Sequence, residues 1–328
     1  MSEHLKGKNA VVTGAAGGLG KEICLAFARE GANIVCNDIG ADRAGAGAEK
    51  TPVDKVVDAV KAIGVKAIAN YDSVVDFKAS EKLINTCVKE FGKIDILVNC
   101  HGMLRDKMIW NMTEDEWDNV VAVHLKGTFN TCRHACVLMR EQKSGRIINV
   151  TSDAWRGTMG HVNYGAVKGG IVSLTRSIAR EMGRYGVTCN AFAPIAKTRM
   201  TMSDDVIKGT WKRVEAGVMS REQAELMMAM PGPEHIPPML VYLATDFADN
   251  INGQVFHTSG GRVGIYCEPI EVRSAYKDIQ LGPFTTDELI KIVPQTLLQG
   301  YINPAPPQPD RDSKDSKDSK DSKDSKKK

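Results

Sequence analysis

The stretch Thr13-Gly-Ala-Ala-Gly-Gly-Leu-Gly20 lies between a short apolar run and the start of an amphipathic run. Glycines let a backbone turn sharply after a strand and approach a pyrophosphate, while the helix start behind them supplies free N–H groups and partial positive charge. A glycine-rich turn that holds no ligand is the alternative. The strand before it and the helix after it favour a dinucleotide site. The predicted contacts are Gly14, Gly18, Leu19 and Gly20.

Around this turn, short β-branched runs alternate with helical patterns along the chain. Near-continuous apolar strands separated by helices predict a parallel sheet covered on both faces, and right-handed crossovers make that sheet doubly wound. The predicted fold class is therefore α/β, with a Rossmann-type, mostly seven-stranded parallel sheet. The predicted strands are Ala10–Thr13, Asn33–Cys36, Lys66–Ala69, Ile94–Val98, Arg146–Val150, Thr188–Phe192 and Gln254–Thr258. The predicted helices are Gly18–Glu30, Pro52–Ile63, Phe77–Phe91, Glu114–Arg140, Val162–Gly183 and Ile236–Leu243.

Several segments depart from this alternation and suggest the domain organisation. We expect an NAD-binding domain over 1–264, with an inserted loop at Ile39–Thr51. Within it, the Met-rich segment 196–238 follows the carboxyl end of a strand, where such folds bind ligands, and is interpreted as a mobile substrate lid. Ordinary peripheral helices are the alternative. A C-terminal extension over 265–302 carries a short helix at Thr286–Ile292, and 303–328 is expected to be a disordered tail without apolar residues to bury.

Composition limits the classes of partner. The chain has 328 residues, of which 42% are hydrophobic and 25% charged, as in ordinary globular proteins. A net charge of +3 argues against a nucleic-acid partner, and no apolar stretch is long enough to predict a membrane span. The polar N-terminus lacks a signal-peptide pattern, so we expect a cytoplasmic protein. Eight cysteines scattered through predicted elements indicate reduced, buried thiols, and none of their spacings indicates a metal site.

A second motif, Tyr164-Gly-Ala-Val-Lys168, places a phenol and an ammonium one helical turn apart. A nearby ammonium favours the phenolate and would lower the tyrosine pKa from ~10 toward the working pH. Ser152 could hold a carbonyl oxygen beside it, and the strand register favours Ser152 over its neighbour Thr151. These groups suit carbonyl reduction or alcohol oxidation. The alternative is a half-buried aromatic beside a lysine that extends to solvent.

Asp38 ends the second predicted strand, eighteen residues past Gly20. A carboxylate there accepts hydrogen bonds from an adenosine ribose and repels a 2′-phosphate. No arginine directly follows it, so the sequence favours NAD over NADP. A solvated loop carboxylate is the alternative.

These motifs together resemble the short-chain dehydrogenases/reductases over about Leu5–Arg262. Within that family the chain looks closest to the (3R)-hydroxyacyl-CoA dehydrogenase unit of the type 2 peroxisomal multifunctional enzymes. The pieces that carry this closer resemblance are Cys36-Asn-Asp-Ile-Gly40, Ala69-Asn-Tyr-Asp-Ser73, Leu104-Arg-Asp106 and Val123-His-Leu-Lys-Gly127.

The resemblance implies roles for individual residues. Tyr164 would be the acid/base, Ser152 would hold the substrate oxygen, and Lys168 would lower the tyrosine pKa and bind the nicotinamide ribose. Tyr164 and Lys168 would thus also contact the cofactor. The resemblance also implies a homodimer or homotetramer, with the Glu114–Arg140 and Val162–Gly183 helices packed across a two-fold axis. The further cofactor contacts that it implies are Asp72, Ser73, Asn99, Gly102, Pro194, Ile195 and Thr198.

The chain departs from the family pattern at three positions. The usual Asn-Asn-Ala-Gly is Asn99-Cys-His-Gly102, which puts His101 near the cofactor. Ile195 replaces a glycine and would narrow the pocket near the nicotinamide. His124 replaces the asparagine that usually holds a water in a proton relay, and a histidine pKa near ~6.5 would make such a relay pH-sensitive. A packed histidine without proton traffic is the alternative.

We therefore predict an NAD-dependent oxidoreductase that interconverts a secondary alcohol and a ketone. The favoured substrate is a 3-hydroxyacyl-CoA/3-oxoacyl-CoA pair, whose phosphates Arg105 and Lys107 could meet unless both are solvated surface charges. A reductase of cyclic, steroid-like or small ketones and diketones is the first alternative, since methionine adapts to irregular apolar shapes. A non-enzymatic nucleotide-sensing interaction protein is the second, and the intact Ser152, Tyr164 and Lys168 argue against it.

Overall fold

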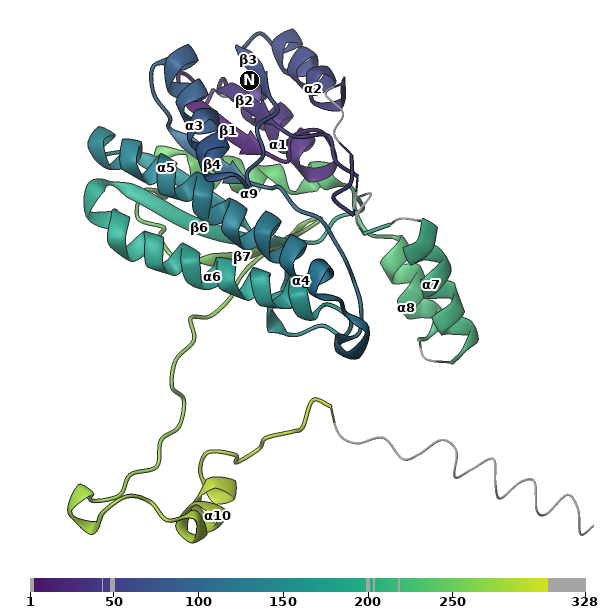
Figure 1. Cartoon of the computed structure of the whole chain (residues 1–328), viewed down its shortest axis with the longest axis vertical. Helices are drawn as coiled ribbons and strands as arrows, with labels where there is room; N and C mark the ends of the chain where they lie inside the picture. Colours follow the sequence, from purple (N-terminus) through teal and green to yellow (C-terminus); the bar gives the residue numbers. More distant parts are fainter. Residues whose placement is uncertain are drawn as a thin grey trace, which may run out of the picture. The chain divides into compact units, whose positions relative to one another are not determined.

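A computed structural model describes residues 3–42, 44–47, 51–198, 201–202, 204–217 and 219–305. The chain divides into two compact units, Met1–Cys267 and a second that begins at Glu268. The first unit contains a sheet with the strand order β3-β2-β1-β4-β5-β6-β7-β8 (Figure 1). Strands β1 to β7 pair in parallel, which confirms the predicted doubly wound sheet. The eighth strand was not predicted and pairs antiparallel with β7.

The element bounds lie within a few residues of those predicted for most of the chain. The strands are β1 (Asn9–Thr13), β2 (Asn33–Asn37), β3 (Ala67–Asn70), β4 (Ile96–Asn99), β5 (Gly145–Val150), β6 (Val187–Pro194), β7 (Val255–Ser259) and β8 (Arg262–Ile265). The helices are α1 (Gly18–Arg29), α2 (Thr51–Ala62), α3 (Phe77–Phe91), α4 (Glu114–Val120), α5 (Gly127–Gln142), α6 (Val162–Met182), α7 (Asp204–Glu215), α8 (Arg221–Met228), α9 (Pro237–Ala244) and α10 (Thr286–Gln295).

Helices cover both faces of the sheet. One hydrophobic core gathers α1, α2 and α9, and the other gathers α3, α5 and α6. Successive strand residues serve the two cores in turn, since Val12 faces the first core and Val11 the second. Because both faces are buried, the central strands carry long apolar runs rather than a strict alternation of apolar and polar residues.

The predicted continuous helix Glu114–Arg140 is wrong in its middle. A capping box at Thr113 starts α4, but the chain then forms a π-helical turn at Val121–Lys126 before α5 begins. A π turn inserts extra backbone into a helix and is found mostly at functional sites. Here the turn carries His124.

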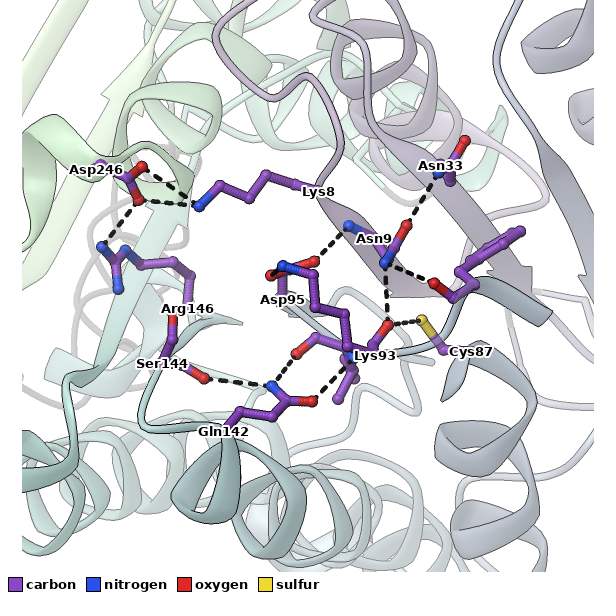
Figure 2. A network of polar contacts seen from close by, with 12 residues as sticks. Lys8, Asn9, Asn33, Cys87, Lys93, Asp95, Gln142, Ser144, Arg146 and Asp246 are labelled. Carbon is purple, nitrogen blue, oxygen red and sulfur yellow. Dashed lines mark hydrogen bonds and ion pairs between the residues drawn. The ribbon is translucent and has the colours of Figure 1, made fainter. Parts of the chain in front are cut away.

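The amino ends of the strands are joined by a network of paired polar groups (Figure 2). The buried carboxylate of Asp95 accepts a hydrogen bond from Asn9 N at 2.9 Å and lies 2.8 Å from Lys93 Nζ. Nearby, Asp246 pairs with Lys8 at 3.0 Å and with Arg146 at 3.5 Å. These contacts tie the ends of β1, β4 and β5 to segments far away in the sequence.

The segment expected to be a lid contains α7 and α8, which pack on each other. Ser220 forms a capping box for α8, and Ala224 and Thr210 are buried between exposed residues. Residues 199–200, 203 and 218 of this segment lie outside the described residues.

In the second unit, Thr285 caps α10, and Lys277 Nζ lies 2.8 Å from both carboxylate oxygens of Glu288. The helix predicted to end at Ile292 extends to Gln295. The expected disordered tail falls largely on residues 306–328, which lie outside the described ones.

Within the described residues, no helix is long and apolar enough to cross a membrane, and no group of His, Cys, Asp and Glu side chains could hold a metal ion. All eight cysteines are free thiols. The prediction of buried thiols is wrong for Cys267, which is exposed at the end of the first unit.

Candidate active site

The glycine turn joins β1 to α1 and leaves no space for a side chain at Gly14 or Gly20. Gly14 has φ +69°, and an added Cβ there would lie 2.7 Å from Cys100 O. An added Cβ at Gly20 would lie 2.0 Å from Gly14 O. A Cβ at Gly18 would face the side chain of Thr198 at 3.7 Å, so Thr198 lies opposite the turn. The backbone forms a cradle of the kind that a pyrophosphate approaches closely.

Asp38 holds this turn at the end of β2. Its Oδ2 accepts a hydrogen bond from Ala16 N at 2.9 Å, and its Oδ1 accepts one from Gly40 N at 2.7 Å. A carboxylate has about four acceptor positions, so both oxygens can still accept a ribose hydroxyl. Asp38 is therefore a structural part of the turn as well as a candidate ligand.

The other predicted cofactor contacts differ in how far their polar atoms are already hydrogen-bonded within the protein. Asp72 is already paired, because it accepts from Asn70 Nδ2 at 2.7 Å and lies 2.9 Å from Lys82 Nζ. The hydroxyl of Ser73 accepts from Val75 N at 3.3 Å. Pro194 ends β6, and Ile195 N donates to Thr258 O at 2.9 Å.

The side chain of Asn99 is turned into the core rather than toward the glycine turn. It donates to Asn149 Oδ1 at 2.9 Å and accepts from Thr131 Oγ1 at 2.7 Å. Gly102 packs against His124, since an added Cβ would lie 2.5 Å from His124 Cε1. Both residues therefore shape the site through packing.

Helix α6 and the end of β5 bring Tyr164, Lys168 and Ser152 together. The hydroxyl of Thr151 donates to Lys168 O at 2.9 Å and is thereby removed from the site, whereas Ser152 lies close enough to Tyr164 to lower its pKa. Lys168 Nζ donates to Val150 O at 2.7 Å and lies 5.4 Å from the centre of the Tyr164 ring.

The electrostatics of this group differ from the prediction. Burial raises the pKa of Tyr164 to about 12, and the hydrogen bond from Ser152 opposes that shift only in part. Burial lowers the pKa of Lys168 to about 7. The predicted lowering of the tyrosine pKa by Lys168 is therefore wrong for the protein without its cofactor, because burial weakens the charge on Lys168 and disfavours the phenolate.

His124 lies on the π turn with its ring edge-on to Tyr164, the two ring centres being 5.3 Å apart. Its Nε2 lies 3.1 Å from Met103 N and 2.8 Å from Met103 O, and its buried Nδ1 has no hydrogen-bond partner among the described residues. Burial, and secondarily the charge of Lys168, lower the His124 pKa well below its ordinary value. This downward shift runs against the predicted relay near neutral pH and favours the alternative of a packed histidine.

His101 lies between the glycine turn and the π turn. Its Nδ1 is 2.7 Å from the hydroxyl of Thr13, and its Nε2 would be 3.0 Å from a Cβ at Gly127. Burial lowers the His101 pKa to about 3, so the ring is neutral. The unusual histidine thus connects the end of β1 to the helix that carries His124.

Sequence reasoning missed two acid–histidine pairs at this edge. His161 Nδ1 lies 3.4 Å from Asp106 Oδ1, and His257 Nδ1 lies 3.5 Å from Asp153 Oδ1. Asp153 also accepts a hydrogen bond from the hydroxyl of Tyr266. The available signals were local: His161 comes three residues before Tyr164, and Asp153 follows Ser152.

The candidates for CoA phosphates differ in their surroundings. Arg105 lies 2.7 Å from Asp115 Oδ2 and donates through Nε to Ala44 O. Its charge is therefore already paired, whereas Lys107 is exposed.

The chain is similar to several known proteins. Residues 8–206 match the family model described as short chain dehydrogenase. The peroxisomal hydratase-dehydrogenase-epimerase of Neurospora crassa is 41% identical over 266 residues, which are 80% of this chain but 27% of that protein. The chain thus spans about a quarter of the length of that relative.

Two mycobacterial proteins match over most of their length. The hydroxyacyl-CoA dehydrogenase ChsB1 of Mycobacterium tuberculosis is 38% identical over 274 residues, which are 81% of either chain. The crystal structure of a short chain dehydrogenase from Mycobacterium avium superposes with a TM-score of 0.74 at 36% identity, covering 93% of this chain and 98% of that one.

Proposed function

The chain belongs to the short-chain dehydrogenase family, and on this premise we propose that it interconverts a secondary alcohol and a ketone with a nicotinamide cofactor. The observation that carries the proposal is the placement of Ser152 and Tyr164. Ser152 acts on the Tyr164 hydroxyl and lowers its pKa, while the competing hydroxyl of Thr151 is bonded to α6.

The proposed chemistry uses Tyr164 as acid and base. In the oxidation direction, Ser152 holds the substrate hydroxyl and Tyr164 takes its proton. A bound oxidised cofactor supplies the hydride acceptor and a positive charge, and that charge lowers the cost of forming the phenolate. In the reduction direction, the protonated Tyr164 donates to the carbonyl oxygen, and its raised pKa keeps the proton in place until then.

We infer that the cofactor is NAD rather than NADP. The cradle at Gly14 and Gly20 suits a pyrophosphate, and the carboxylate of Asp38 beside it disfavours a 2′-phosphate. Titration of NADH and NADPH by fluorescence tests this, and tighter binding of NADPH would contradict it.

The proposed substrate is a 3-hydroxyacyl-CoA/3-oxoacyl-CoA pair, supported by the hydroxyacyl-CoA dehydrogenase named among the relatives. The test is NADH oxidation with acetoacetyl-CoA, compared with cyclohexanone and diacetyl. Turnover of the CoA thioester alone supports the proposal. Turnover of only the ketones supports the cyclic or small-ketone alternative.

The remaining proposals concern organisation. We propose a catalytic domain over 1–264 with a lid at 196–238, an extension over 265–302, and a homodimer or homotetramer. Light scattering tests the oligomer, and protection of the lid from proteolysis by NADH tests its closure. A cytoplasmic location competes with the peroxisomal one in the name of the Neurospora relative, and cell fractionation decides between them.

A further inference from the structure

Two histidine rings flank Tyr164, and they differ in access to water. His124 is 1% exposed, and its ring centre lies 5.3 Å from that of Tyr164. His161 lies on another element, with its ring centre 6.1 Å from that of Tyr164 and 30% of its side chain exposed. A proton that leaves Tyr164 for solvent therefore has one buried neighbour and one at the boundary with water.

His161 is held beside a carboxylate. Its buried Nδ1 lies 3.4 Å from Asp106 Oδ1, so the exposed part of the ring lies away from that nitrogen. His161 occupies the N-cap position of α6, yet its side chain makes no capping hydrogen bond. The ring is thus directed to Asp106 and Tyr164 rather than to the helix end.

The backbone keeps this pair in place. Lys107 N donates to Gly160 O at 3.0 Å, and Lys107 and His161 form a β-bridge. The buried side chain of Asn163 donates to Arg105 O at 2.9 Å, which fastens the segment before Asp106 to the first turn of α6. Two separate segments are therefore fixed around the acid–histidine pair.

The carboxylate of Asp106 also acts on the phenol. It contributes to the raised pKa of Tyr164, so its charge is felt at the hydroxyl. The titratable groups around His161 are Asp106 and Lys107 on the adjoining segment and Tyr164 on α6. His124, on the other side of Tyr164, is bonded to the backbone of Met103, and burial lowers its pKa well below the ordinary value.

We propose that His161, oriented by Asp106, exchanges protons between Tyr164 and solvent. This inference rests on the proposed dehydrogenase function. In alcohol oxidation, hydride leaves with both electrons for the nicotinamide, and the hydroxyl proton moves to Tyr164. Tyr164 then passes that proton, through one bridging water, to the His161 nitrogen that faces away from Asp106. The resulting imidazolium releases it to bulk water, and reduction reverses each step.

The test measures acetoacetyl-CoA reduction by NADH in the variants His161→Ala and Asp106→Asn. We expect His161→Ala to lower kcat by about 10²-fold with an unchanged KM for NADH, and added imidazole to restore activity in proportion to its concentration. Asp106→Asn should lower kcat less than His161→Ala and leave the KM for NADH unchanged, because it removes only the carboxylate that orients the His161 ring. Imidazole should leave the wild type unaffected.

His4→Asn is the control, since it changes a histidine whose ring contacts Phe247 rather than Tyr164. It should retain kcat within a few-fold and gain nothing from imidazole. Full activity in His161→Ala, or a loss that imidazole does not restore, would overturn the inference. NADH binding reports folding, and His161→Gln replaces the alanine variant if that variant fails to bind.

Tyr164→Phe separates this inference from the function on which it rests. If Tyr164→Phe keeps its activity, the proposed function itself fails. If Tyr164→Phe is inactive and His161→Ala is unaffected, only the proton route through His161 fails.

Discussion

The two edges of the sheet treat their polar groups in opposite ways. At the amino edge, Asp95, Arg146 and Asp246 are paired with neighbours from distant segments (Figure 2). At the carboxyl edge, His101 Nε2 and His124 Nδ1 are buried without a hydrogen-bond partner among the described residues. A buried polar group without a partner is costly, so such groups persist where something other than stability selects them.

This difference suggests that the amino edge of the sheet stabilises the fold, whereas the carboxyl edge carries the chemistry. Doubly wound sheets bind ligands beyond the carboxyl ends of their strands, and these two unpartnered histidine nitrogens lie at that edge. We therefore expect substitutions at the amino edge to change the free energy of unfolding, and substitutions at the carboxyl edge to change turnover or cofactor binding.

The strongest test of the carboxyl edge is Tyr164→Phe. Loss of the proton donor should lower kcat by about 10²–10⁴-fold, because general acid/base catalysis contributes on that scale. The thermal midpoint and the NADH dissociation constant should stay near wild type. Steady-state kinetics, thermal denaturation and fluorescence titration measure these quantities, and a large fall in the thermal midpoint would show that the edges are not separated in this way.

Gly20→Ala should weaken NADH binding by about 10-fold or more. A Cβ at this position would lie 2.0 Å from Gly14 O, so the turn must open to accept it. Gly17→Ala is the matched control from the same turn, because a Cβ there meets nothing within 4 Å and its φ of −169° is extended backbone. Equal affinities in the two variants, measured by titration, would contradict the cradle.

Asp95→Ala tests the opposite edge. It removes the buried acceptor of Asn9 N and should lower the free energy of unfolding by about 1–3 kcal/mol. Turnover per folded molecule should remain unchanged. Urea denaturation and kinetics at 25 °C measure the two quantities, and reduced kcat at full folding would break the comparison.

The smallest expected effect is a pH dependence of stability from Lys168. Its pKa falls from 10.5 to about 7 on folding, so the unfolded chain binds more protons between these values and stability rises with pH there. The slope is at most about 1.4 kcal/mol per pH unit for one group. Lys168→Met should flatten it.

This slope is best measured by denaturation between pH 7 and 8.5. Above pH 9 the opposite contribution begins, since burial raises the pKa of Cys87 and Cys100 to about 12. An unchanged slope in Lys168→Met would show that Lys168 is charged in the folded protein at neutral pH.

The sequence predicted those parts of the fold that depend on short local patterns of residues. Strands β1 to β7 follow from short apolar runs, and the glycine turn follows from positions that only glycine can occupy. Strand β8 was missed because Arg262–Ile265 is short and mostly exposed, and it depends on pairing with β7. The π turn was missed because a helical pattern does not reveal the contact between His124 and Met103.

The candidate site was predicted in identity but not in electrostatics. Tyr164, Lys168 and Ser152 were found by spacing, yet the pKa of each ionisable group depends on burial by distant segments. Asn99 was assigned to the cofactor, whereas Asn149 and Thr131 hold its side chain in the core. His161 gained its interest only when the fold placed Asp106 beside it.

Because Cys267 is exposed, it can be labelled selectively with a thiol reagent. It is the one exposed thiol among eight, and burial raises the pKa values of several of the others, including Cys24, Cys87 and Cys132. A maleimide fluorophore at neutral pH should therefore attach at Cys267 alone, without any engineered cysteine. Because this residue ends the first unit, such a dye would report on motion of the C-terminal segment while the acid/base group stays untouched.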